Sequence, residues 1–165
     1  MRPVACPLKI CLLGTFAVGK TSLVRRFAEA VFDETYETTV GVRIDRVRID
    51  DIDAVLWDLP AEDRFQSLVP SHLRQTCGLL LVADVTRGAT VPAALQLEAR
   101  ASRIVGPVPA VMVLNKIDRG SRDVNFAALD GLEERGVDII ETSARTGTGV
   151  NEIFSRIVKK ASAII

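Results

Sequence analysis

Short apolar runs alternate along the chain with segments in which apolar residues recur at helical spacing. The apolar runs are Leu8–Gly14, Gly78–Asp84 and Pro109–Asn115. The helical segments are Lys20–Ala30, Ala89–Val105, Val124–Arg135 and Val150–Ala163. Apolar runs bounded by glycine or polar residues are typical of strands that helices cover on both faces. The alternation therefore predicts an α/β fold built around a mostly parallel sheet.

The segment Val42–Asp50 differs, because its apolar residues alternate with arginine and aspartate as in a half-exposed strand. The alternation slips near Arg46, which predicts a β-bulge there. Asp50–Asp53 then turns the chain into a further strand, Ala54–Asp58. Together the segments predict a single domain over residues 1–165, with a six-stranded sheet that has one antiparallel edge. Ligands of such sheets bind at the carboxyl ends of the strands.

Composition limits the possible functions. The chain of 165 residues carries 21 Lys and Arg against 21 Asp and Glu, so it lacks the basic surplus that nucleic-acid-binding proteins use. Cys6, Cys11 and Cys77 show no C-x-x-C spacing, so a zinc site is not indicated, and a reducing compartment such as the cytoplasm is favoured. The chain contains no run of 18 apolar residues, so no membrane span is predicted. Residues 161–165 contain no cysteine for prenylation, so no lipidation signal is expected.

The segment Gly14–Thr21 fits the pattern G-x-x-x-x-G-K-[ST] between a predicted strand and a predicted helix, which is the context that this phosphate-binding motif requires. Backbone N–H groups and the positive end of the helix would surround phosphates. Lys20 would contact the β- and γ-phosphates, and the Thr21 hydroxyl suits Mg²⁺. The alternative, a glycine-containing loop with an exposed lysine and no ligand, is disfavoured by that context. The nucleotide-binding residues expected here are Phe16, Ala17, Val18, Gly19, Lys20, Thr21 and Ser22.

Two motifs after later strands indicate which base is bound. The motif N-K-I-D ends in Asp118, whose carboxylate can accept hydrogen bonds from both N1–H and the exocyclic amine of guanine. Adenine has no N1–H and would leave that acceptor unpaired, at a cost of roughly 1–3 kcal/mol. The segment Glu141–Arg145 adds a loop whose backbone can face the guanine oxygen. The residues expected at the base are Asn115, Lys116, Asp118, Ser143, Ala144 and Arg145.

These motifs, in this order and each at a strand end, resemble those of Ras-superfamily small GTPases over essentially the whole chain. The most similar members are Rab proteins, on the stretches Trp57-Asp58 and Arg64–Ser71 and on the first-switch residues Phe32, Tyr36, Thr39 and Gly41. The resemblance implies a P-loop NTPase three-layer sandwich that binds GTP or GDP with Mg²⁺. It also implies that Phe32 packs against the guanine and that Thr39 ligates Mg²⁺ and senses the γ-phosphate. Asp58 would hold the metal through water.

The sequence departs from this family at Leu59–Asp63, which reads L-P-A-E-D where the family usually reads T-A-G-Q-E. Glu62 replaces the glutamine that orients the attacking water, and its negative charge would lie close to the γ-phosphate. Ala61 replaces a glycine whose N–H contacts the γ-phosphate, and Pro60 stiffens the segment. Phe16 replaces a small residue of the phosphate loop. Its ring either covers the phosphate and excludes an arginine from a GAP, or packs against the altered second switch.

The sequence therefore predicts a guanine-nucleotide switch that hydrolyses GTP slowly. Lys20, Thr39 and Glu62 are the expected catalytic residues, and Thr21, Thr39 and Asp58 the expected metal ligands. The alternative is an interaction module that binds GTP with little useful hydrolysis; a kinase or an ATPase is opposed by N-K-I-D. The resemblance further implies a monomer whose switch regions bind effectors, exchange factors or GAPs.

One partner surface can be judged from the sequence. The positions at which many Rab proteins carry an effector-binding aromatic triad are occupied by Ile44, Trp57 and His72. Only the tryptophan keeps the aromatic pattern, so effectors that recognise the full triad are not expected to bind.

Overall fold

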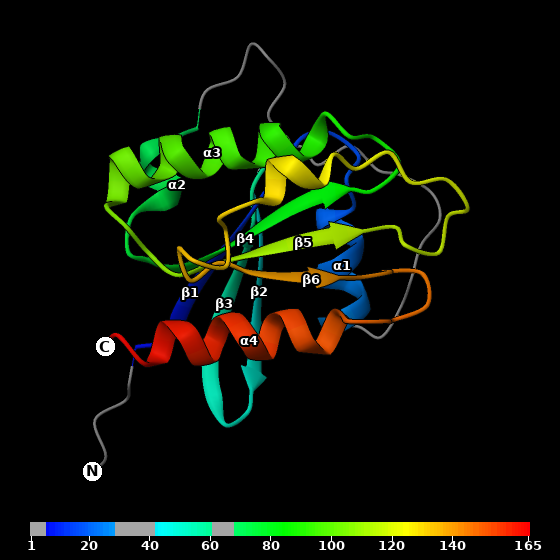
Figure 1. The fold of residues 1–165 in the computed structure, drawn as a ribbon. Helices are drawn as coiled ribbons and strands as arrows, with labels where there is room; N and C mark the ends of the chain where they lie inside the picture. The colour runs from blue at the N-terminus through cyan, green and yellow to red at the C-terminus, as the bar shows by residue number, and fades with distance from the viewer. Residues whose placement is uncertain (1–5, 29–41, 61–67) are drawn as a thin grey trace.

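A six-stranded sheet runs through the centre of the protein, with helices on both of its faces (Figure 1). The computed structural model describes residues 6–28, 42–60 and 68–165. The strands are β1 (Leu8–Leu13), β2 (Arg43–Ile49), β3 (Ile52–Asp58), β4 (Thr76–Asp84), β5 (Ala110–Asn115) and β6 (Asp138–Glu141). The helices are α1 (Lys20–Ala28), α2 (Pro70–Leu73), α3 (Thr90–Val105) and α4 (Val150–Ser162), with a 3₁₀-helix η1 (Phe126–Leu129).

The strands follow the order β2-β3-β1-β4-β5-β6 across the sheet. Every neighbouring pair is parallel except β2 and β3, which form an antiparallel hairpin at one edge. The predicted mostly parallel sheet with one antiparallel edge is therefore confirmed. Because the parallel strands all run the same way, their carboxyl ends lie along one edge of the molecule, where loops can form a site.

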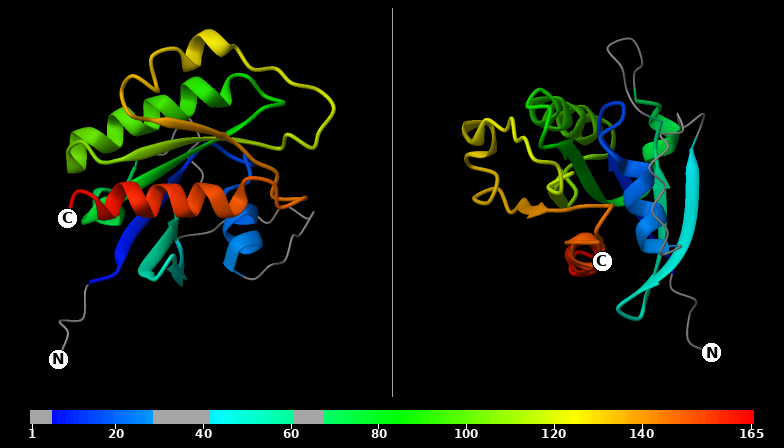
Figure 2. Two further views of the ribbon diagram at one scale, coloured as in Figure 1. Left: turned by 60° about the horizontal axis from the view of Figure 1, so that its bottom comes forward. Right: turned by 90° about the vertical axis from the view of Figure 1, so that its right-hand side faces the viewer.

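The pleat of the buried strands explains why their sequences are apolar throughout. Successive side chains of a strand point to opposite faces. In β1, Ile10 and Leu12 pack into the core that contains α1 and α4, whereas Cys11 and Leu13 pack into the core that contains α3. Figure 2 shows the resulting three layers, with α1 and α4 on one face of the sheet and α3 on the other.

The bulge predicted near Arg46 is wrong, because β2 pairs with β3 without interruption along its whole length. The apolar pattern shifts for another reason. Arg43 and Asp45 occupy the half-buried positions of β2 and form an ion pair, with 2.8 Å between Arg43 Nε and Asp45 Oδ2. Ile44 therefore lies on the outer face, where half of its side chain is exposed.

The helix predicted over Val124–Arg135 is also wrong, because only η1 is helical there and turns follow it. The Asn125 side chain caps η1 by accepting a hydrogen bond from the Ala127 N–H at 3.0 Å. Asp130 then leaves the helical region, with φ −59° and ψ 137°, and Gly131 adopts a φ of +78°. The apolar spacing fits a helix, but the Asn and Asp-Gly signals within it favour turns and decide the outcome.

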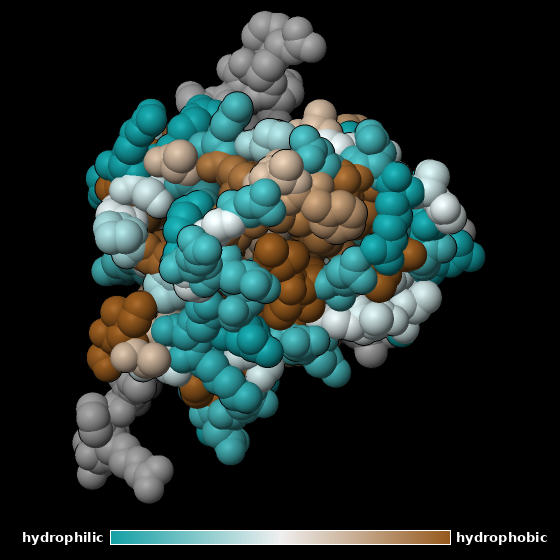
Figure 3. All heavy atoms as spheres, viewed as in Figure 1, coloured by the Kyte–Doolittle hydropathy of each residue, from teal (hydrophilic) through white to brown (hydrophobic). Residues whose placement is uncertain are grey.

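The surface in Figure 3 is mainly polar over α4, and apolar side chains gather above it and at the end of the chain. Phe126 of η1 and Ile164 are exposed apolar side chains. Of the helices in the described ranges, none combines the length and apolar composition required to cross a bilayer.

Candidate nucleotide-binding site

The carboxyl ends of the parallel strands bring several polar segments to one edge of the sheet. Gly14 follows β1, Asp58 ends β3, Asp84 ends β4 and Asn115 ends β5. Asp84 lies directly beside Asn115 in the strand register. The loop at 142–149 follows β6 at the same edge. The sequence motifs are thus collected into one site by strand order rather than by proximity along the chain.

Lys20, the first residue of α1, is buried against the loop that precedes it. Its Nζ donates a hydrogen bond to the Gly14 carbonyl at 2.8 Å and lies 3.5 Å from the Thr15 carbonyl. Burial lowers the pKa of Lys20 to about 8, and the negative charge of Asp58 opposes part of that shift. A further anion beside Lys20 would favour its charged form, so this loop is electrostatically suited to phosphate.

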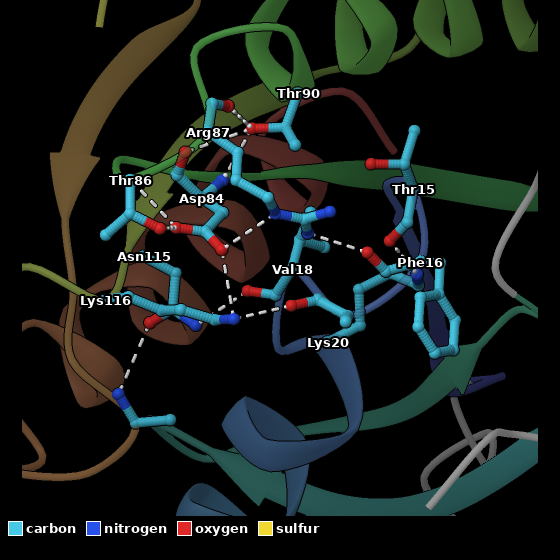
Figure 4. Close-up of polar contacts among 12 residues, drawn as sticks. Thr15, Phe16, Val18, Lys20, Asp84, Thr86, Arg87, Thr90, Asn115 and Lys116 are labelled. Atoms are coloured by element: carbon cyan, nitrogen blue, oxygen red, sulfur yellow. Dashed lines mark hydrogen bonds and ion pairs between the residues drawn. The ribbon is translucent and has the colours of Figure 1, made fainter. Parts of the chain in front are cut away.

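Side chains of the base motif donate hydrogen bonds to main-chain carbonyl groups of the phosphate loop (Figure 4). Asn115 Nδ2 donates to the Val18 carbonyl at 3.0 Å, and Lys116 Nζ donates to the Ala17 carbonyl at 2.6 Å. Between these contacts and α1, Gly19 has a φ of +105°, and a Cβ on it would overlap the Asn115 amide nitrogen. Glycine is therefore required at position 19, because only a residue without a Cβ lets the Asn115 amide come this close to the phosphate loop.

The oxygen-bearing side chains of Thr21 and Asp58 contact each other near Lys20. Thr21 Oγ1 donates to Asp58 Oδ2 at 2.5 Å. Burial raises the pKa of Asp58, more than the Thr21 hydrogen bond and the Lys20 charge lower it. Among the described residues, no donor reaches Asp58 Oδ1, although this oxygen is buried. An unpartnered carboxylate oxygen beside a hydroxyl is the kind of donor set that Mg²⁺ prefers, so these residues fit the expected metal.

The base motif is held by hydrogen bonds to the loop after β6. Asn115 Oδ1 accepts from Thr142 Oγ1 at 3.0 Å and from the Ala144 N–H at 3.3 Å. Ser143 Oγ donates to Asp118 Oδ1 at 2.7 Å. Asp118 itself is exposed, so its carboxylate remains open to a ligand on a loop that is already anchored. The structure thus brings the two predicted base segments into direct contact.

Comparison with known protein families identifies the family of this chain. The Ras family model matches residues 9–163. This chain belongs to the Ras family. It is a GTP-binding small GTPase, and its sheet and helices have the arrangement expected for the P-loop NTPase fold of this family. Members of the family generally bind GTP or GDP with Mg²⁺ and interact with effectors, exchange factors and GAPs.

Two residues of this small GTPase that the sequence motifs missed, Asp84 and Arg87, link the phosphate loop to the base motif. Asp84 Oδ1 accepts from the Thr86 N–H at 2.9 Å and from Thr86 Oγ1 at 2.6 Å. Asp84 Oδ2 lies 3.0 Å from Lys116 Nζ and 3.2 Å from Arg87 Nε. Although burial raises the pKa of Asp84, the hydrogen bonds from Thr86 and Lys116 hold it below its ordinary value. Arg87 Nη2 donates to the Phe16 carbonyl at 2.7 Å.

The sequence contains a signal that could have identified Asp84 as a site residue of the GTPase. It contains none for Arg26, which contacts the loop after β6. Asp84 ends an apolar strand just as Asp58 and Asn115 do, so the strand-end rule points to it as well. Arg26 of α1 donates to the carbonyl of Arg145 at 3.3 Å and to that of Thr146 at 3.2 Å. That contact joins segments 119 and 120 positions apart, and no local pattern announces it.

The remaining predicted site residues of the GTPase fall into two groups. The switch residues Phe32, Thr39, Ala61 and Glu62 lie outside the described residues, as does Tyr36. Ser22 lies half-buried in the first turn of α1, and Arg145 is exposed in the loop after β6. Phe16 is 52% exposed, and its ring points away from Arg87 and Asp84 (Figure 4).

The triad positions of this Ras-family chain lie on β2, β3 and α2. The rings of Trp57 and His72 are tilted, with centroids 6.4 Å apart. Lys9 Nζ lies 3.6 Å from the Trp57 centroid and donates to the Arg74 carbonyl at 2.9 Å. The Trp57 ring therefore has a cation over its face and an imidazole nearby, while Ile44 is exposed.

Proposed function

We propose that this Ras-family protein is a molecular switch that binds GTP and GDP with Mg²⁺ and hydrolyses GTP slowly. The observation that carries the proposal is the direct bonding between the phosphate loop and the base motif. Asn115 contacts the Val18 carbonyl and Lys116 contacts the Ala17 carbonyl. A ligand that spans both segments has a base at one end and phosphates at the other, which describes a nucleotide.

Lys20 would stabilise the phosphate charge. Its ammonium group is buried and bonded to the Gly14 carbonyl, so it already lies against the loop that would surround the phosphates. Negative charge on the phosphate oxygens would raise the pKa of Lys20 and keep it protonated. The same cation would stabilise charge that develops during transfer of the γ-phosphoryl group.

Mg²⁺ would be held by Thr21 and, through water, by Asp58. Asp58 Oδ1 is buried and has no donor among the residues that the structure describes, which supports this role, since a buried carboxylate oxygen needs a donor or a cation. Thr39 is the further ligand that the family resemblance implies, and it lies outside the described residues. When bound, Mg²⁺ would neutralise negative charge on the β- and γ-phosphates.

Guanine would be selected by Asp118. Ser143 fixes one of its carboxylate oxygens at 2.7 Å, so the carboxylate is oriented before the base arrives. Its remaining lone pairs can accept from N1–H and the exocyclic amine of guanine. The backbone of Ala144 and Arg145 would line the side of the base that carries the guanine oxygen.

Slow hydrolysis follows from the chemistry of the second switch. Glu62 offers a negative carboxylate where a neutral amide would orient water, and repulsion from the γ-phosphate opposes its approach. Ala61 lacks the freedom of glycine to adopt a positive φ. Pro60 restricts the residue before it, so the segment moves less freely between nucleotide states. Phe16, which is half exposed, would obstruct an arginine supplied by a GAP.

Partners would bind at the switch regions and at the neighbouring face of β2 and β3. Trp57 is presented there by Lys9, and Ile44 is exposed beside it. This surface is Rab-like in position. It differs from that of Rab proteins with the full aromatic triad, so we expect a different set of effectors.

The nucleotide that co-purifies with the protein tests the binding proposal. The protein is purified without added nucleotide, denatured with acid, and the released nucleotide is separated by chromatography. We expect a guanine nucleotide. Recovery of GTP supports slow turnover, recovery of GDP supports an active hydrolase, and recovery of ATP would overturn the assignment of the base.

Hydrolysis is tested by single-turnover measurements on the wild type and on Glu62→Gln, each loaded with GTP. We expect a slow wild type and a faster variant, because the neutral amide removes the repulsion and can both donate to and accept from water. A wild-type rate at or above that of the variant contradicts the role assigned to Glu62. Matched rates of nucleotide release show that the variant is correctly folded.

A further inference from the structure

We propose that Arg87 is a positioning residue for the phosphate loop, which it holds in the conformation that points the loop's N–H groups at phosphates. This inference rests on the proposed function and adds to it a residue outside every motif of the sequence. Arg87 lies in the loop between β4 and α3, and its Nη2 donates to the Phe16 carbonyl at 2.7 Å (Figure 4).

Consecutive carbonyl groups of the phosphate loop are each held by a different side chain. Arg87 holds the carbonyl of Phe16, Lys116 that of Ala17 and Asn115 that of Val18. A trans peptide group is planar, with its N–H directed opposite to its C=O. Fixing a carbonyl on the outer side therefore fixes the next N–H on the inner side. Arg87 in this way orients the N–H of Ala17.

Ala17 is the residue that most needs this support, because its φ is +60°. A left-handed conformation is unfavourable for alanine and persists only where the surroundings determine it. Arg87 holds the carbonyl before Ala17, and Lys116 holds the carbonyl of Ala17 itself. Without Arg87, one of the two peptide groups that flank Ala17 loses its side-chain contact.

Arg87 is itself held in place by a buried carboxylate. Asp84 is buried, and Oδ2 of its carboxylate lies 3.2 Å from Arg87 Nε and 3.0 Å from Lys116 Nζ. The main-chain N–H of Arg87 also donates to the Asp84 carbonyl at 3.0 Å. Asp84 thus joins the two cations that hold the phosphate loop, one from the base motif and one from outside it.

The contact requires arginine. The planar guanidinium presents Nε to Asp84 and Nη2 to the Phe16 carbonyl at the same time. A lysine at this position carries the same charge, but its compact ammonium group lacks the fixed fork that joins these two acceptors. This difference separates a positioning role from simple attraction between a cation and a phosphate.

The test compares ligands that share a base and differ in phosphates. The affinities of GDP and of guanosine are measured with Mg²⁺ for the wild type, Arg87→Ala and Arg87→Lys. We expect Arg87→Ala to weaken GDP binding about tenfold, as for loss of a hydrogen bond from a charged donor. Guanosine affinity should change less than about twofold, because its binding does not use the loop N–H groups. Arg87→Lys should resemble Arg87→Ala.

Arg156→Ala provides the matched control. Arg156 of α4 has the same exposure as Arg87, 45%, and also forms an ion pair, with Asp138 at 3.3 Å. Its contacts lie away from the phosphate loop, so its removal should leave the affinities of both ligands unchanged. Loss of affinity in this control would mean that removal of any such arginine weakens binding, and would overturn the proposal.

Other outcomes are equally decisive. Equal weakening of GDP and guanosine by Arg87→Ala would show a general structural role and overturn the proposal. Full GDP affinity in Arg87→Lys would show that charge alone is sufficient, and would also overturn it. Failure of the proposed function would look different, because the wild-type protein itself would then bind no GDP.

Discussion

The base end and the phosphate end of the site differ in how far their polar groups are satisfied within the protein. At the base end, Asn115 bonds through both its amide nitrogen and its oxygen, and Ser143 holds Asp118. At the phosphate end, Lys20 is buried with a lowered pKa, and Asp58 is buried with a raised one. The base end is held together by hydrogen bonds within the protein, whereas the phosphate end holds charges that a ligand would stabilise. The proposed base selectivity and the proposed switching would thus have different physical origins.

Gly19→Ala should have the largest effect on GDP affinity, because it disrupts the contact between Asn115 and the phosphate loop that joins the two ends of the site. A Cβ at this position overlaps the Asn115 amide nitrogen, and the φ of +105° is strained for alanine. We expect GDP affinity to fall at least about 100-fold, or about 2.7 kcal/mol, measured by titration calorimetry. Gly120→Ala is the control, since a Cβ there meets no atom within 4 Å. Similar affinities for both variants would refute the link.

The pH dependence of stability should reveal the free-energy cost of burying the charged Lys20 at the phosphate end. The pKa of Lys20 is about 8 in the folded protein and 10.5 without its surroundings, so the unfolded chain binds more protons between these values. Stability of the nucleotide-free protein should therefore rise with pH from about 8 to 10.5, by up to about 3 kcal/mol. Urea unfolding across this range measures it.

Two controls assign this rise to Lys20. The variant Lys20→Met removes the titrating group, so its stability curve should be flatter over the same pH range. Bound GDP should also flatten the curve, because phosphate raises the pKa of Lys20. A wild-type curve that falls or stays level between pH 8 and 10.5 contradicts the assignment.

Asp58→Asn should abolish the response to metal without altering the base end. Asp58 Oδ1, which no donor in the described ranges reaches, is the oxygen assigned to Mg²⁺ through water, and an amide lacks the charge that favours the cation. We expect Mg²⁺ to slow GDP release from the wild type about tenfold more than from the variant, by stopped-flow fluorescence. Guanosine affinity should be equal in the two proteins. An undiminished metal effect would remove Asp58 from the proposed site.

Ser143→Ala should have the smallest effect. In contrast to Asp58→Asn, it should weaken guanosine binding and leave the effect of Mg²⁺ unchanged. The change removes the 2.7 Å hydrogen bond to Asp118 and leaves Mg²⁺ dependence intact. We expect about 1 kcal/mol weaker binding for both guanosine and GDP, which corresponds to a loss of about fivefold. Competition binding with both ligands measures it. A loss for GDP alone would mean that Ser143 acts through the phosphate end.

The sequence was informative where structure is set by local spacing. The phosphate motif around Lys20 and the base motif around Asp118 each lie in one short segment, so their places at strand ends could be predicted. The mixed sheet followed from the alternation of apolar runs. The antiparallel edge was also predicted, although the bulge at Arg46 was not found, because an ion pair rather than an extra residue alters the pattern there.

The contacts that join the motifs could not be predicted in the same way. Arg87 and Arg26 each bond to carbonyl groups of loops distant in sequence, and any surface arginine has the same local appearance. The helix expected at Val124–Arg135 failed for a different reason, because the turn signals at Asn125 and Asp130-Gly131 are present in the sequence and outweigh the apolar spacing. Long-range hydrogen bonds are properties of the folded chain, and a local pattern does not contain them.

The distance along the chain between Val18 and Asn115 has a consequence for synthesis. Their hydrogen bond spans 97 positions, so the phosphate loop emerges from the ribosome well before β5 is made. At about 5–20 residues per second, this interval lasts roughly 5–20 s. The growing chain has no complete nucleotide site during that time. Nucleotide that contacts both sides of the proposed site would therefore stabilise the chain only after β5 has been made.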